Sequence, residues 1–414
     1  MSNAFSWVFL AALAAATLMR LWLASRQMRH VRAHREAVPA TFATVIPLSA
    51  HQKAADYTVA KVKSGVVGVV LDAVVLLALT LGGLLQWLSS RWEALLPLGS
   101  IWHGVALIIS VVALRMLTGL PLTLYRTFVI EQRFGFNKMT VKLFITDMAK
   151  GLLLGVALGV PLLVVVLWLM GAAGSYWWLY VWIVLALFAV FMQLIVPTFI
   201  MPWFNKFSPL QDATLVERVE RLLARCGFRS KGLYVMDGSK RSAHGNAFFA
   251  GVGASKRIVL FDTLVERLSP GEVEAVLAHE LGHYKLNHIK KMLAIGFAET
   301  LAGLFILGLL VNQAWFYQGL GVQSQTLAIA LLLFMLVSPA FTYFLEPLQA
   351  LRSRKHEFEA DAYATQHAQA SDLMQALVKL YKDNAATLTP DPLHSAFYDS
   401  HPPAATRIAR LRTA

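Results

Sequence analysis

Seven long apolar segments alternate with polar segments along the 414 residues of this chain. A membrane-spanning helix needs about 20 mostly apolar residues, and each of these segments reaches that length. The expected spans are residues 5–24, 66–88, 101–125, 151–171, 176–200, 292–311 and 326–349. The pattern therefore predicts a mainly α membrane protein that crosses the bilayer seven times.

Two long polar segments interrupt the series of spans. We expect them to form one water-exposed domain, with five spans before the first segment and two spans between the segments. The expected parts are residues 1–200, 201–291, 292–349 and 350–414. Two consecutive spans return the chain to the side of the membrane from which it left, so both polar segments are expected on the same side.

The first polar segment carries the pattern of a small α/β unit. Residues 211–226 place apolar side chains on one helical face. Three strand-like runs follow, at residues 233–236, 246–252 and 257–262. Another helix is expected to begin after Ser269, because Pro270 and Glu272 stand where a capping box needs them. The polar domain is therefore expected to contain a small β-sheet with helices beside it.

The composition agrees with a membrane protein. Hydrophobic residues make up 57% of the chain and charged residues 15%, whereas a soluble domain is nearer one quarter charged. This excludes an ordinary soluble enzyme and a disordered chain. The single cysteine, Cys226, excludes a disulfide scaffold and a metal site built from several cysteines.

The distribution of positive charge predicts the orientation. Lysine and arginine number 37 against 24 acidic residues. Arg91 is the only lysine or arginine in the loops 89–100, 172–175 and 312–325, whereas the other connecting segments are rich in both residues. Since such residues favour the cytoplasmic side, we expect the N-terminus outside and both polar segments inside. Nucleic-acid binding is not expected, because the basic residues are spread over several loops without a compact recognition module.

Four charged residues fall inside apolar runs. They are Arg20, Asp72, Arg115 and Glu299. Charges at such positions are costly unless they pair, reach the interface or face water. Paired or snorkelling side chains are one interpretation, and a hydrated interior cavity, which four such residues favour, is the other.

The helix after Ser269 contains the motif His279-Glu280-x-x-His283. Histidines at positions i and i+4 project from one helical face, close enough to bind a single metal ion. Glu280 lies beside that ion rather than on it, where it can accept a proton from water. The motif therefore predicts a zinc peptidase site.

Such a site needs a third protein ligand. The candidates downstream are His288, Glu299, His356, Glu357, Glu359, Asp361, His367, His394 and His401. Glu357 and Asp361 lie at positions i and i+4 of an expected helix, so one carboxylate can bind metal while the other accepts a hydrogen bond from a histidine ligand. Glu359 is interpreted as part of a solvated acidic face. The two spans between His283 and Glu357 allow both to reach one site.

With these motifs the sequence resembles a known family, the type I CAAX prenyl proteases, which are integral-membrane zinc metallopeptidases. The resemblance covers nearly the whole chain. Besides the zinc motif, it rests on residues 125–138, 202–207, 246–249 and 256–264, on Ser400-His401-Pro402-Pro403 and on Arg407. It implies seven transmembrane helices around a large hydrated chamber, capped by a cytoplasmic zinc peptidase domain of the thermolysin type.

The resemblance also implies roles for individual residues. His279, His283 and Glu357 would bind one Zn²⁺, and Glu280 would be the catalytic base.

Two further residues of the site follow from the same resemblance. Asn246 would lie on an edge strand that pairs with the substrate backbone, and His401 would face the active site and donate to the charge that develops on the substrate. From its position after His401, Arg407 is expected to contact the carboxylates of the zinc site, as Asp361 is expected to contact a histidine ligand.

The expected partners are a protein or peptide substrate and the lipid bilayer. Eukaryotic members of the family trim prenylated C-terminal peptides. The Ala- and Leu-rich composition and the absence of a lysine-based retrieval tail in residues 410–414 favour a bacterial inner-membrane member. Its substrates would then be unprenylated or misfolded membrane proteins.

Two other functions fit the sequence less well. A site-2 type intramembrane protease would carry the histidine motif inside a span, but here polar sequence precedes it and Lys285, Asn287, Lys290 and Lys291 follow it. A seven-span transporter with a chance zinc motif would concentrate polar residues in broken helices at mid-membrane, and the four scattered charges do not show that.

Overall fold

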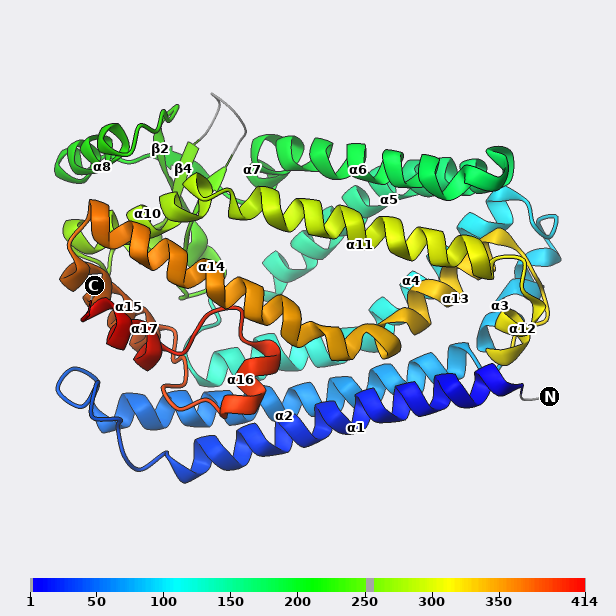
Figure 1. The fold of residues 1–414 in the computed structure, drawn as a ribbon, viewed down its shortest axis with the longest axis horizontal. Helices are drawn as coiled ribbons and strands as arrows, with labels where there is room; N and C mark the ends of the chain where they lie inside the picture. Colours follow the sequence, from blue (N-terminus) through cyan, green and yellow to red (C-terminus); the bar gives the residue numbers. More distant parts are fainter. Residues whose placement is uncertain (1–2, 251–256, 414) are drawn as a thin grey trace.

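The computed structural model describes residues 3–250 and 257–413. The molecule is elongated, and long helices run along it side by side (Figure 1). The sheet and the C-terminal helices gather at one end, while the N-terminus lies at the opposite end (Figure 1). The polar domain therefore caps one end of the helical array.

Seven helical segments among the described residues are long and apolar enough to cross a membrane. They are Ala4–Ala33 (α1), Leu48–Leu79 (α2), Ile101–Glu131 (α4 Ile101–Tyr125 and the π-helical turn η1), Val141–Ala172 (α5), Gly174–Phe204 (which includes α6 Trp177–Ile195 and α7 Met201–Phe204), His288–Leu310 (α11) and Leu327–His367 (α13 Leu327–Thr342 and α14 Glu346–His367). The predicted number of spans is confirmed, and the chain is a multi-pass membrane protein.

The predicted limits of the second span are wrong. The prediction of 66–88 follows apolar residues across a turn, whereas α2 begins at Leu48 and ends at Leu79. Gly83 adopts a positive φ of 76° after it, and the separate helix α3 (Leu84–Glu93) follows. The cap residue of α2 is Thr80, three residues before Gly83. This break depends on backbone conformation rather than on polarity, so hydropathy alone does not locate the boundary.

Several spans continue as helices into the polar domain. The last one was predicted over residues 326–349, but the helical segment that begins at Leu327 runs to His367. Its second half, α14, is polar and carries the acidic residues of the candidate site. A continuous but bent helical segment thus connects the membrane region to the site (Figure 1).

The polar domain contains a four-stranded sheet with the order β1-β2-β4-β3. The strands are Phe207–Pro209 (β1), Leu233–Met236 (β2), Ala247–Ala250 (β3) and Arg257–Phe261 (β4). β2 and β4 are parallel, and the other pairs are antiparallel. The three predicted strands are confirmed, although residues 251 and 252 of the second lie outside the described residues. β1 was not predictable from the sequence, because its three residues show no alternation.

The predicted amphipathic helix is α8 (Ala213–Arg225). It packs against α10 (Pro270–Lys285), which in turn packs against α14 and α15 (Ala370–Asp383). Leu222 of α8 and Leu277 of α10 are completely buried in this core. The remaining helices are α9 (Asp262–Val265), α12 (Ala314–Gly319), α16 (Pro392–Tyr398) and α17 (Ala404–Leu411).

A glycine allows α10 and α14 to approach closely. A Cβ atom at Gly282 would lie 3.0 Å from Cα of Ala360 and 3.1 Å from Cβ of Tyr363. Such distances are shorter than ordinary van der Waals contact. The close approach brings the histidine motif beside the acidic residues of α14.

Three of the four charged residues inside apolar runs share one cavity. Arg20, Asp72 and Arg115 line a cavity of about 110 Å³ between α1, α2, α4 and α13. Arg115 lies 3.7 Å from Asp72, and Arg20 lies 3.6 Å from Glu346. Glu299 is exposed on α11, apart from this group. Charge pairing therefore occurs at this point of the membrane region.

Candidate metal centre and active site

The helix that carries the histidine motif begins as predicted. The Oγ of Ser269 accepts a hydrogen bond from the backbone N–H of Glu272, and the carboxylate of Glu272 accepts one from the backbone N–H of Ser269. Lys379 of α15 also contacts Glu272, at 2.7 Å. This capping box fixes the first turn of α10. α10 is not one of the seven membrane-length helices, so the motif does not lie inside a span as in a site-2 type protease.

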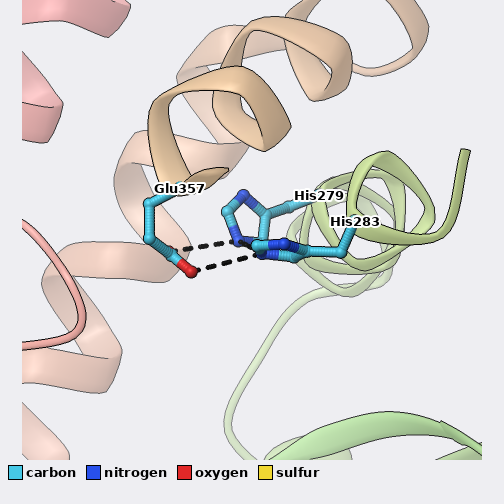
Figure 2. A group of neighbouring side chains, drawn as sticks. All are labelled: His279, His283 and Glu357. Atoms are coloured by element: carbon cyan, nitrogen blue, oxygen red, sulfur yellow. Dashed lines mark hydrogen bonds and ion pairs between the residues drawn. The ribbon is translucent and has the colours of Figure 1, made fainter. Parts of the chain in front are cut away.

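Two helices bring the three expected metal ligands together. His279 and His283 project from α10, and Glu357 projects towards them from α14 (Figure 2). The two Nε2 atoms are 3.2 Å apart. The carboxylate oxygens of Glu357 lie 3.4 Å from Nε2 of His279 and 3.2 Å from Nε2 of His283.

These separations fit a zinc ion. Zinc takes four ligands at about 2.0–2.2 Å in a tetrahedron, which places ligand atoms about 3.3 Å apart. The Oε2 atom of Glu357 is buried and makes no hydrogen bond among the described residues, and its charged neighbours are Nε2 of His279 at 3.4 Å and the guanidinium of Arg407 at 3.3 Å. Two imidazole nitrogens and a carboxylate also form a common donor set for zinc. The residues present therefore fit the metal that the motif implies.

Asp361 and Arg407 lie behind His279. Oδ1 of Asp361 is 2.9 Å from Nδ1 of His279. The guanidinium of Arg407 donates two hydrogen bonds to Asp361, at 2.8 and 2.6 Å, and lies 3.3 Å from Glu357. Both side chains are buried. The bidentate pair fixes the carboxylate, and the carboxylate fixes the orientation of the His279 ring.

The pKa of His279 reflects these carboxylates. Burial disfavours the charged imidazole, but Asp361 and Glu357 favour it, and together they raise the pKa of His279 to about 9. The centre therefore stabilises a positive charge. Burial also raises the pKa of Glu280, against the opposing effect of His279 and His283.

A cleft of about 260 Å³ opens beside His279. Polar residues of the expected site line it, and apolar side chains of α9, α10 and α15 form much of the rest. The polar residues are Asn246, His279, Glu280, His401 and Arg407. The cleft thus offers room for a peptide beside the metal ligands.

His401 and Asn246 both line this cleft. Nε2 of His401 is 3.4 Å from Oε1 of Glu357, and its Nδ1 is 2.9 Å from Oγ of Ser400. Asn246 is exposed just before β3, and its side-chain oxygen accepts a hydrogen bond from the backbone N–H of Ala247. β3 pairs with β4 on one side and stands at the end of the sheet order.

Two further residues, His288 and Glu359, lie next to the site, and their role was not predicted from the sequence. Nδ1 of His283 is 3.0 Å from Nδ1 of His288, and Nε2 of His288 is 2.9 Å from Glu359. Glu359 is therefore not simply part of a solvated acidic face. His288 follows the motif by five residues, which is a weak signal in sequence. The other candidates, Glu299, His367 and His394, do not belong to the cluster formed by the three ligands.

Known protein families match the chain along almost its whole length. Residues 27–206 match the family described as "CAAX prenyl protease N-terminal, five membrane helices", and residues 209–414 match "Peptidase family M48". The boundary between the matches lies close to the expected boundary between the first five spans and the polar domain.

Characterised relatives and a solved structure agree with these matches. The CAAX prenyl protease 1 homolog of Arabidopsis thaliana is 39% identical over 339 residues, covering 80% of this chain and 79% of that protein. CAAX prenyl protease 1 of Saccharomyces cerevisiae is 38% identical over 315 residues, covering 72% and 70%. The crystal structure of S. mikatae Ste24p has a TM-score of 0.92 and 31% identity, and the match covers 99% of this chain and 100% of that chain.

Proposed function

Because the chain belongs to peptidase family M48, we propose that His279, His283 and Glu357 hold one Zn²⁺ at which this membrane metallopeptidase hydrolyses peptide bonds. The observation that supports this proposal most directly is the set of three separations of 3.2–3.4 Å between the ligand atoms. Three protein ligands would leave the fourth coordination position of the zinc ion for water or substrate.

The metal and Glu280 divide the chemistry between them. When bound, zinc supplies a Lewis acid that polarises the peptide carbonyl and makes water easier to deprotonate. Glu280 is the general base: its carboxylate accepts the proton of the attacking water and then donates it to the nitrogen of the leaving peptide. Asp361 and Arg407 hold His279 in the orientation that keeps its Nε2 directed towards the metal.

His401 stabilises the charge that forms on the substrate. Attack on a peptide carbonyl places negative charge on its oxygen, and a positioned N–H group lowers the energy of that state. His401 lines the cleft, and its Nε2 reaches the carboxylate of Glu357. Pro402 and Pro403 restrict the backbone that follows. The imidazole is thus held at the edge of the metal centre where the carbonyl oxygen is expected.

β3 and Asn246 bind the substrate backbone. An extended peptide can add to the free edge of a sheet by hydrogen bonds that are independent of side-chain identity. The side-chain oxygen of Asn246 already accepts a bond from Ala247, which leaves its amide N–H groups directed to other acceptors such as a peptide carbonyl. The substrate then lies between the sheet edge and α10.

The substrate class follows from the relatives. They are named CAAX prenyl protease 1, and we infer that this chain trims C-terminal peptides of prenylated proteins. If its membrane is the bacterial inner membrane, as the composition favours, the same site would degrade unprenylated or misfolded membrane proteins. In both cases residues 201–291 and 350–414 form one peptidase domain in the cytoplasm, and the N-terminus lies outside.

Two variants test the assignment of the site. Glu280→Gln is expected to abolish hydrolysis of a fluorogenic prenylated peptide while the purified protein keeps about one zinc per chain. His283→Ala is expected to lose both. Glu217→Gln, an exposed carboxylate paired with Arg221 on α8, is the control and should retain both. A full zinc content in His283→Ala would contradict the ligand assignment.

A further inference from the structure

A histidine that binds metal through one ring nitrogen must carry its proton on the other. For His279 the structure shows how this is ensured. Its Nδ1 lies 2.9 Å from Asp361, and an ionised carboxylate can only accept a hydrogen bond. The proton therefore resides on Nδ1, and the lone pair of Nε2 remains available.

His283 has a different arrangement behind it. Its Nδ1 faces not a carboxylate but Nδ1 of His288, at 3.0 Å. The other nitrogen of His288 lies 2.9 Å from Oε2 of Glu359. His288 is almost completely buried, with 1% of its surface exposed, so its ring is shielded from solvent and these two contacts fix its orientation.

In the series His283–His288–Glu359, the carboxylate at the end fixes the position of each proton. The carboxylate of Glu359 accepts a hydrogen bond from Nε2 of a neutral His288, so the proton of His288 lies on Nε2 and its Nδ1 can only accept a hydrogen bond. The proton of His283 then lies on Nδ1, and its Nε2 is left with a free lone pair. We propose that His288 and Glu359 form a two-bond relay that holds His283 in its metal-binding tautomer. They are positioning residues, and the inference rests on the proposed function.

Two features of the fold support this geometry. Asn287 adopts a left-handed backbone, with φ of 58°, a conformation that asparagine tolerates better than most residues. The chain therefore turns sharply between α10 and α11, and His288 comes back beside His283. The ring of His356 on α14 lies parallel to that of His288, with centroids 4.1 Å apart and planes 8° apart.

A second metal ion is the other function that these residues suggest. His288, His356 and Glu359 have potential ligand atoms within 4.8 Å of one another. However, both nitrogens of His288 already have partners. The lone pairs of two stacked imidazoles lie in parallel planes, so they do not converge on one ion. The geometry thus favours the relay over a second metal site.

The relay predicts a loss of metal affinity. Removing a group that orients a ligand typically weakens metal binding about 10- to 100-fold. We expect that loss for His288→Ala in the purified full-length protein, measured by zinc competition with a chelating dye. His288→Asn, whose side-chain oxygen can accept the bond from His283, should recover most of the affinity. Glu359→Ala should give an intermediate loss.

The same proteins separate the relay from simpler explanations. Thermal unfolding in excess chelator reports packing alone, and His288→Ala and His288→Asn should unfold at similar temperatures there. Lys355→Ala is the control. This exposed lysine lies 3.9 Å from Oε1 of Glu359, the oxygen that does not contact His288, so the variant should keep wild-type zinc affinity.

Three outcomes would overturn the relay. They are unchanged zinc affinity in His288→Ala, equal losses in His288→Ala and His288→Asn, and a wild-type content of two zinc ions that falls to one in His288→Ala. Failure of the wild-type protein to bind zinc would instead contradict the proposed function, so the two failures are distinguishable.

Discussion

The contact between α10 and α14 makes a strong prediction for the substitution Gly282→Ala. A Cβ atom at this position would lie 3.0 Å from Cα of Ala360, 3.1 Å from Cβ of Tyr363 and 3.2 Å from the carbonyl oxygen of Ala360. Ordinary contact begins at about 3.5 Å, and two of these atoms belong to the backbone. The helices must therefore separate by about 0.5 Å, by comparison with that contact distance.

The stability cost should be small and the functional cost large. Overpacking costs about 1–3 kcal/mol, while the better helix propensity of alanine returns about 1 kcal/mol. Glu357 lies three residues before Ala360, so the displacement separates it from His279 and His283. Zinc distances tolerate about 0.2 Å. We therefore expect zinc affinity to fall tenfold or more, with turnover falling in parallel.

The assay compares zinc competition, peptide turnover and thermal unfolding for Gly282→Ala and a matched glycine. Gly155→Ala on α5 is the control, because its Cβ would meet no described atom within 4 Å. It should keep zinc affinity and turnover. Wild-type zinc affinity in Gly282→Ala would refute the argument that this glycine sets the distance between the ligands.

Three further predictions test the substrate side and the orientation. His401→Ala should lower turnover about 10²–10³-fold while zinc content stays constant, and unchanged turnover would leave His401 a structural role. Asn246→Ala should raise KM or lower kcat at unchanged zinc content and melting temperature; wild-type kinetics would show that Asn246 serves only the turn before β3. After replacement of Cys226, a cysteine in place of Asn312 should react with an impermeant reagent added outside intact cells and one in place of Lys382 should not, whereas the reverse pattern would contradict the orientation.

The membrane region was predictable in number but not in detail. Hydropathy identifies seven spans because the hydrocarbon core selects against polar residues whatever the tertiary structure. It does not identify the extensions of α2 and α14 into the polar domain, because helix outside the membrane is not selected for apolarity. It also misplaced the end of the second span, where the turn at Gly83 is decided by backbone conformation rather than by polarity.

The histidine motif was predictable because its chemistry is local. Positions i and i+4 of a helix share a face in any fold, so His279 and His283 could be assigned together from the sequence. The roles of the acidic residues, by contrast, depend on contacts between different helices. Glu357 and Asp361 also share a face, and the residues alone did not decide which of them binds metal. The structure places the carboxylate of Glu357 within 3.4 Å of both Nε2 atoms and that of Asp361 at Nδ1 of His279. This distinction depends on how α14 is rotated against α10.

The contrast between the two histidines explains why part of the site could not be predicted. His279 is supported directly by Asp361, a carboxylate one helical turn from Glu357, so the sequence already contained that spacing. His283 lies a turn further along α10, where a second carboxylate of α14, Glu359, supports its Nδ1 only through His288. That intermediate residue belongs to the next helix and reaches the site because of the left-handed turn at Asn287. Sequence spacing records neighbours on one helix, whereas this support depends on three helices meeting, and only the fold determines that.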